Sequence, residues 1–99
     1  MLLDVNAEAV AGSSVNESAI SAEIGAATAA TSAALTCVLP MGADLDSVAF
    51  AAALNAAGAS YIATATEHLS GRTAFAEAQG VAAVTYTALD VVNNTALAL

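Results

Sequence analysis

The sequence predicts an all-α fold, an antiparallel hairpin of two helices, and three observations support this. The chain has 99 residues and is 59% hydrophobic. Most of that fraction is alanine, the best helix former. Apolar positions recur at spacings of three, four and seven, which is a helical period. The single proline, Pro40, separates the two periodic stretches, and proline disfavours helix at the residue before it.

The first helix is expected over about 7–38, within one domain that covers residues 1–99. Asn6 is a good N-cap, and Glu8 lies in the first turn, where the helix dipole favours negative charge. Its apolar stripe contains Val10, Ile20, Ile24, Ala27, Thr31, Ala34, Leu35 and Val38. The turn is expected at 39–44, because Pro40 stops the helix and Gly42 permits a reversal.

The second helix is expected over about 45–88, with Asp44 as its N-cap and a C-terminal tail after it. One heptad row contains Leu54, Tyr61, His68, Phe75, Ala82 and Leu89, and a neighbouring row contains Val48, Ile62, Leu69, Ala76 and Ala83. The two rows are expected to form one apolar stripe. Gly58 lies beside this stripe and is expected to allow close approach of the first helix.

A turn near Gly42 also predicts the register of the hairpin. Residues should pair when their numbers add to about 84, as in a short-looped antiparallel helix pair. This register places Cys37 and His68 far apart, so it excludes a Cys–His catalytic pair. Cys37 is then expected to be a small buried residue near the turn, and His68 a polar residue of the stripe.

The charge balance excludes several classes of partner. The formal net charge is −8, and Arg72 is the only lysine or arginine. Nucleic acids and anionic membrane surfaces need clustered basic residues, so neither is an expected partner. Arg72 is expected to form a surface ion pair, with Glu8 as the suggested acid.

No arrangement of residues indicates a catalytic, metal-binding or phosphate-binding site. One histidine and one cysteine cannot supply the ligands of a zinc site, and the stretch around Asp44 and Asp46 lacks the spacing of a calcium loop. No glycine-rich phosphate loop is present either. We therefore expect no enzymatic activity, catalytic residue, cofactor, metal or small-molecule substrate.

Two helices cannot enclose a core, and large apolar side chains are scarce. A soluble hairpin of this composition should be marginal, and an exposed apolar stripe marks an interaction surface. The sequence therefore predicts partner helices that complete a four-helix bundle. The residues expected at that partner interface are Ile20, Ile24, Leu35, Val48, Leu54, Tyr61, Ile62, Leu69 and Phe75.

Two segments and one residue pair of the chain resemble the PE family of mycobacterial proteins. Asn6-Ala7-Glu8-Ala9 is similar to the family's Asn-Pro-Glu-Ala opening, with alanine in place of proline. The segment VLPMGADLDSVAFAAAL is similar to its turn and second helix. Tyr86 and Asp90 lie one helical turn apart, where the family carries its Tyr-x-x-x-Asp/Glu secretion signal.

The resemblance implies a function. PE proteins are substrates of type VII (ESX) secretion systems and pair with PPE proteins, whose helices complete a four-helix bundle. An ESX-specific chaperone contacts the PPE partner in the cytoplasm. The pair is then exported folded, to the outside or the cell surface, with Tyr86 and Asp90 as the signal in this chain.

Two alternatives stay open. The chain could be a self-assembling structural protein, in which a homodimer builds the four-helix bundle. It could instead be a membrane hairpin, because the uncharged runs 24–43 and 47–66 reach the length of a transmembrane helix. Their alanine, threonine, serine and glycine insert weakly, and no lysines flank them, which favours the soluble alternatives.

Overall fold

The computed structural model describes residues 3–98 and contains two helices, α1 (Ala7–Thr36) and α2 (Leu45–Leu97), with no strand in that range. The described chain is thus all-helical, as predicted. The expected ends of the helices were about 38 and 88. The first helix stops slightly earlier than that, and α2 continues well beyond 88.

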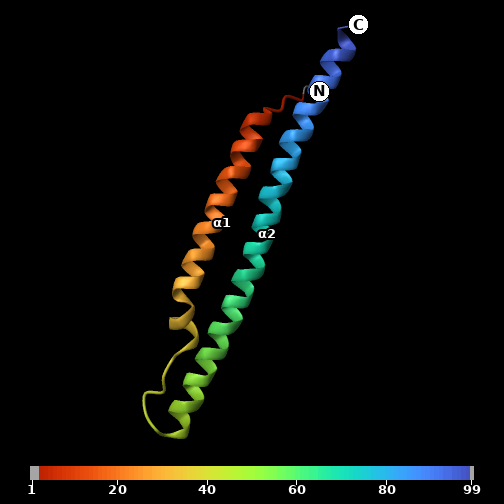
Figure 1. The fold of residues 1–99 in the computed structure, drawn as a ribbon. Helices are drawn as coiled ribbons and strands as arrows, with labels where there is room; N and C mark the ends of the chain where they lie inside the picture. Colours follow the sequence, from red (N-terminus) through yellow and green to blue (C-terminus); the bar gives the residue numbers. More distant parts are fainter. Residues whose placement is uncertain (1–2, 99) are drawn as a thin grey trace. The chain divides into compact units, whose positions relative to one another are not determined.

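The chain divides into two compact units, each built from parts of both helices. The turn unit contains residues 22–70, and the terminal unit contains residues 3–21 and 71–98. Within each unit a segment of α1 runs antiparallel beside a segment of α2 (Figure 1).

Side-chain hydrogen bonds define where both helices begin. The Ala9 amide donates to Asn6 Oδ1 at 3.0 Å, and the Val10 amide donates to the Asn6 carbonyl at 3.2 Å. At α2 the Ser47 amide donates to Asp44 Oδ2 at 2.9 Å, and its hydroxyl donates to Asp44 Oδ1 at 2.8 Å. Each cap oxygen satisfies an amide that the helix itself leaves unpaired.

Small residues form the contact between the helices. The buried apolar residues of the described chain are Ala51, Ala76 and Ala83, and none of its large side chains is fully buried. We call the α1-facing positions of α2 the seam. They form two heptad rows, all buried or half-buried: Ala51, Gly58, Ala65, Arg72 and Gln79, and Asn55, Ile62, Leu69, Ala76 and Ala83. This spacing is typical of coiled-coil packing.

Gly58 lies where the backbones of α1 and α2 approach closely, as its position beside the stripe predicted. A Cβ built on Gly58 would overlap the backbone carbonyl of Leu35. Gly25 faces α2 in the same unit, and a Cβ there would lie 3.1 Å from Leu69 Cδ2. The turn unit therefore depends on glycine in both helices for its close packing.

The predicted register was wrong. It would have paired Val38 with a residue near 46, but Val38 is hydrogen-bonded to Asn55. The physical reason is the connection: α1 ends at Thr36, and a non-helical segment runs along the first turns of α2 before the chain bends at 41–44. A non-helical residue advances farther along the chain direction than a helical one, so the pairing is shifted. The expected Arg72–Glu8 ion pair was wrong for the same reason. Arg72 Nη2 contacts Glu17 Oε2 at 2.7 Å.

Candidate functional site

The heptad row of α2 that was predicted to start at Leu54 is largely exposed, and we call it the outer row. Its members are Leu54, Tyr61, His68, Phe75, Ala82 and Leu89, of which only Ala82 is half-buried. Tyr61 is 62% exposed and Phe75 is 55% exposed. The outer row lies one residue before a seam row, about 100° away around the helix. The apolar side of α2 is therefore wider than α1 alone can cover.

The structure divides the nine expected interface residues into two groups. Ile24, Leu35, Ile62 and Leu69 are half-buried, whereas Ile20, Val48, Leu54, Tyr61 and Phe75 are exposed. In the half-buried group, Ile62 and Leu69 belong to the seam. The sequence could not separate the groups, because both rows are apolar and adjacent. The exposed group is the surface that remains open to a partner.

Asn55 anchors the connection to α2, and sequence reasoning missed it. The Val38 amide donates to Asn55 Oδ1 at 2.7 Å, and Asn55 Nδ2 donates to the Val38 carbonyl at 3.0 Å. Both backbone groups of Val38 are thereby satisfied outside any helix. A usable signal existed: asparagine is a poor helix former, and Asn55 stands in an alanine-rich helix.

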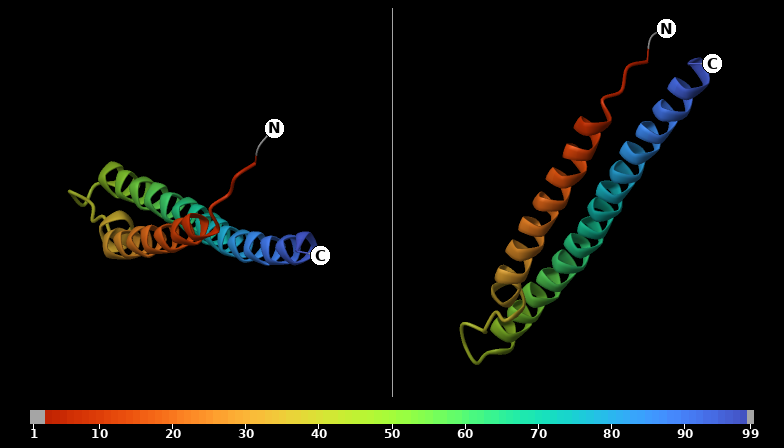
Figure 2. Two further views of the ribbon diagram at one scale, coloured as in Figure 1. Left: turned by 90° about the horizontal axis from the view of Figure 1, so that it is seen from above. Right: turned by 45° about the horizontal axis from the view of Figure 1, so that its top comes forward.

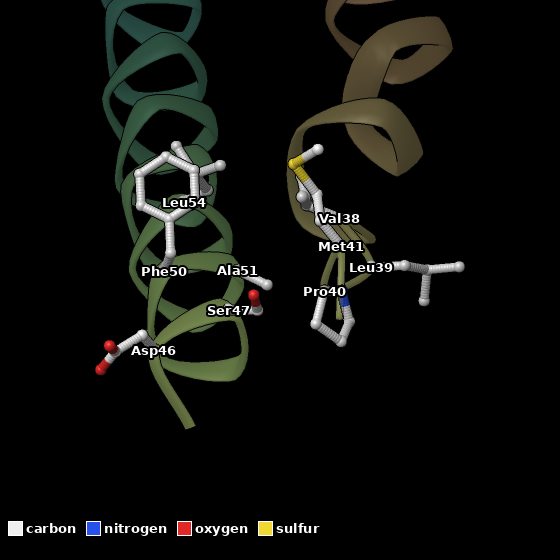
Figure 3. A pocket seen from close by; sticks show the side chains of 9 residues that line it. All are labelled: Val38, Leu39, Pro40, Met41, Asp46, Ser47, Phe50, Ala51 and Leu54. Atoms are coloured by element: carbon white, nitrogen blue, oxygen red, sulfur yellow. The ribbon is translucent and has the colours of Figure 1, made fainter. Parts of the chain in front are cut away.

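The anchored connection and the start of α2 enclose an open apolar pocket of about 330 Å³. Figure 3 shows its lining, with Ser47 and Ala51 directed toward the connection and Asp46 directed away from it. The exposed residues Met41 and Phe50 also line this pocket. The pocket gives the turn unit an apolar surface at the end of the hairpin, in addition to the outer row.

The terminal unit is joined by polar side chains. Ser14 Oγ donates to the Ala76 carbonyl at 2.6 Å, and Gln79 Nε2 donates to Ser13 Oγ at 2.9 Å. The Arg72–Glu17 ion pair adds a third cross-helix contact. Beside the start of α1 lies an open groove of about 550 Å³, lined by Ala7, Glu8, Ala11, Ala83, Val84, Thr87, Ala88 and Val91.

Tyr86 and Asp90 lie inside α2, not on a non-helical tail. Their i, i+4 spacing on one helix directs both side chains to the same face. Tyr86 is 36% exposed and Asp90 is exposed. The helix thus holds a hydroxyl and a carboxylate in a fixed relation, accessible to a binding protein.

Comparison with known proteins identifies the family. The family model described as "PE family" matches residues 3–93. The chain belongs to the PE family. It is 40% identical to the PE-PGRS family protein PE_PGRS8 of Mycobacterium tuberculosis over 104 residues, which covers 92% of this chain. The match spans 59% of the length of that relative. No solved structure matches this PE chain.

The charge of this PE chain is concentrated on exposed carboxylates. Glu17 is half-buried beside Arg72, and the other eight acidic residues are exposed. The Ser47 backbone amide, and then the Ser47 hydroxyl, hydrogen-bond the Asp44 carboxylate and lower its pKa below the ordinary value of 3.8. These bonds favour the charged form, so Asp44 stays ionised at the start of α2.

The side chains of the PE chain that could bind a metal or act in catalysis lie apart from one another. Within residues 3–98, no three His, Cys, Asp or Glu side chains gather closely enough to hold a metal ion. Cys37 is exposed, so the expectation that it would be buried was wrong. The reason is again the connection: α1 ends at Thr36, and Val38 rather than Cys37 contacts α2. His68 is exposed in the outer row.

The second helix of the PE chain also meets the length and composition of a membrane span. Within Leu45–Leu97, an 18-residue window has a mean hydropathy of 1.4, and 11% of that window is buried. An alanine-rich helix that packs against partner helices meets the same criteria. The observation keeps the membrane hairpin as a testable alternative.

Proposed function

We propose that this PE protein is a non-enzymatic subunit of a PE–PPE heterodimer that a type VII (ESX) secretion system exports in folded form. The observation that carries the proposal is the exposed outer row on a hairpin whose buried core is alanine. Helices of a PPE protein would cover this row and complete a four-helix bundle. An ESX-specific chaperone would contact the PPE partner in the cytoplasm before export.

Charge substitutions on α2 test the interface, and the chain offers matched controls. Tyr61→Asp and Phe75→Asp each put a carboxylate on the outer row, where burial by a partner would be costly. Ser60→Asp and Ala74→Asp put the same charge one residue earlier, on the side of α2 opposite the seam. We expect the outer-row variants to lose co-purification with the PPE protein and the controls to keep it. Equal co-purification of all four variants would exclude the outer row as the interface.

We further propose that Tyr86 and Asp90 are the export signal. Both side chains are accessible on one face of α2, so a single receptor could contact them together. Tyr86→Ala should leave the heterodimer intact and keep it in the cell pellet. Thr85→Ala, an exposed neighbour, is the matched control and should be secreted. Normal secretion of Tyr86→Ala would show that the signal assignment is wrong.

The membrane hairpin is a second candidate, favoured by the hydropathy of α2. Fractionation of the native host separates the two candidates. Heterodimer subunits should leave the membrane fraction in carbonate and appear in the secreted fraction. Retention in carbonate-washed membranes would support the hairpin and contradict the heterodimer.

A further inference from the structure

The seam of α2 ends at Tyr86 and Asp90. Continuing the row of Arg72 and Gln79 by one heptad gives Tyr86, and continuing the row of Ala76 and Ala83 gives Asp90. The proposed signal residues therefore occupy the next two positions of the surface that packs on α1. Ala83 is 5% exposed, whereas Tyr86 is 36% exposed and Asp90 is exposed. The seam opens to solvent at this pair.

The seam opens here because α1 begins at this level of the terminal unit. Ser13 is hydrogen-bonded to Gln79, and Ala7 and Thr87 line the same groove. In this antiparallel register Tyr86 is level with the first turn of α1, and Asp90 lies past it. Figure 2 shows the non-helical residues that precede α1. Tyr86 and Asp90 therefore lie at the boundary between the part of the seam that α1 covers and the part that it leaves uncovered.

The sequence before Ala7 could extend this packing, but the cap prevents it. Leu3 lies seven residues before Val10 and would fall on the same seam-facing row of a longer α1. Instead Leu3 is 74% exposed, because Asn6 accepts the Ala9 amide and α1 starts at Ala7. An additional turn of α1 would bring apolar side chains over Asp90 and the open side of Tyr86.

We propose that Asn6 is a positioning residue: by fixing the start of α1, it leaves Tyr86 and Asp90 as an uncovered continuation of the seam for the export receptor. The role in export rests on the proposed function of Tyr86 and Asp90. The effect of Asn6 on the exposure of Tyr86 does not rest on that proposed function, because this exposure can be measured directly.

Two insertions of equal length and charge test this in the protein as purified from its host, with any bound partner. The helical insertion places a second copy of Ala7–Ser13 directly after Asn6, which keeps the cap and adds about 10 Å of helix in heptad register. The control insertion places a Gly/Ser segment of the same length, with one glutamate, directly before Asn6. Its α1 is unchanged.

Tyrosine nitration mapped by peptide mass spectrometry gives the exposure of Tyr86, with the wild-type protein nitrated under the same conditions as the reference. We expect the helical insertion to slow nitration of Tyr86 several-fold and to reduce export, while the control insertion matches the wild type in both. Equal nitration of Tyr86 in the two insertions would overturn the proposal. If the helical insertion protects Tyr86 from nitration but the protein is still fully exported, the proposed role of Asn6 in export is wrong.

Substitutions at the cap give an independent test. Asn6→Asp keeps a good N-cap and should retain wild-type nitration and export. Asp4→Ala combined with Asn6→Ala removes the Asn6 cap and the acidic side chain before it, so that neither can stop an extension of α1 toward Leu3, and should slow nitration of Tyr86. Faster nitration in this double variant would contradict the proposal. Normal export of Tyr86→Ala, which overturns the signal itself, leaves these nitration comparisons unchanged, so the two failures are distinguishable.

Discussion

The turn unit and the terminal unit join the same two helices by different means. In the turn unit the backbones approach closely, at Gly58 against Leu35 and at Gly25 against Leu69. In the terminal unit the buried Ala76 and Ala83 are accompanied by polar cross-helix contacts from Ser14, Gln79 and Arg72. Close packing depends on shape and tolerates little change, whereas polar contacts on a half-exposed surface exchange readily with water. The turn unit should therefore fix the register of the hairpin, and the terminal unit should open more easily.

Glycine substitutions should give the largest difference between the units. Gly58→Ala places a methyl group on the Leu35 carbonyl, and we expect a loss of about 3 kcal/mol in unfolding free energy from overpacking. Gly71→Ala is the matched control in the terminal unit, because a Cβ there has no neighbour within 4 Å. It should stabilise the helix by about 1 kcal/mol. Urea unfolding measures both, and equal effects at the two sites would contradict the difference in packing.

Asn55→Ala should have the next largest effect, confined to the turn unit. It leaves the amide and the carbonyl of Val38 without their partner, at a cost of about 2 kcal/mol. Hydrogen exchange should show faster exchange at the Val38 amide and no change around Gln79. Asn55→Asp is the control, since its carboxylate can still accept from the Val38 amide. Unchanged hydrogen exchange at the Val38 amide in Asn55→Ala would show that Asn55 does not anchor the connection.

The Arg72–Glu17 ion pair should contribute less. Its side chains are 28% and 24% exposed, so water screens part of the attraction. A double-mutant cycle with Arg72→Gln and Glu17→Gln should give a coupling of about 0.5–1 kcal/mol. A coupling equal to the effect of Gly58→Ala would mean that the terminal unit is held as firmly as the turn unit.

Acid should weaken the turn unit slightly through Asp44. Its folded-state pKa lies below 3.8, so the charged carboxylate stabilises the fold above that pH. This contribution is lost as the pH falls from 3.8 through the lowered pKa. Asp44→Asn keeps a capping oxygen that does not titrate and should flatten the stability profile in this acid range. Identical profiles for the two proteins would show that the cap does not contribute.

The sequence was sufficient for the helices and insufficient for their register. Alanine content, Pro40 and the capping pattern predicted an all-α chain with a single interruption, because those signals are local. The register depends on how Val38 pairs with Asn55, a contact over 17 positions that no local pattern specifies. The same limit applies to the two apolar rows of α2. Their periodicity gives a stripe, but only the position of α1 decides which row is covered.

The most direct test of the account is the composition of the purified protein. The tagged chain would be isolated from its native host, identified with its partners by mass spectrometry and sized by light scattering. We predict a one-to-one complex with a PPE protein, in which cross-links reach the outer row near Tyr61 and Phe75. A soluble, cooperatively melting homodimer with that row protected and no PPE protein bound would contradict the central claim.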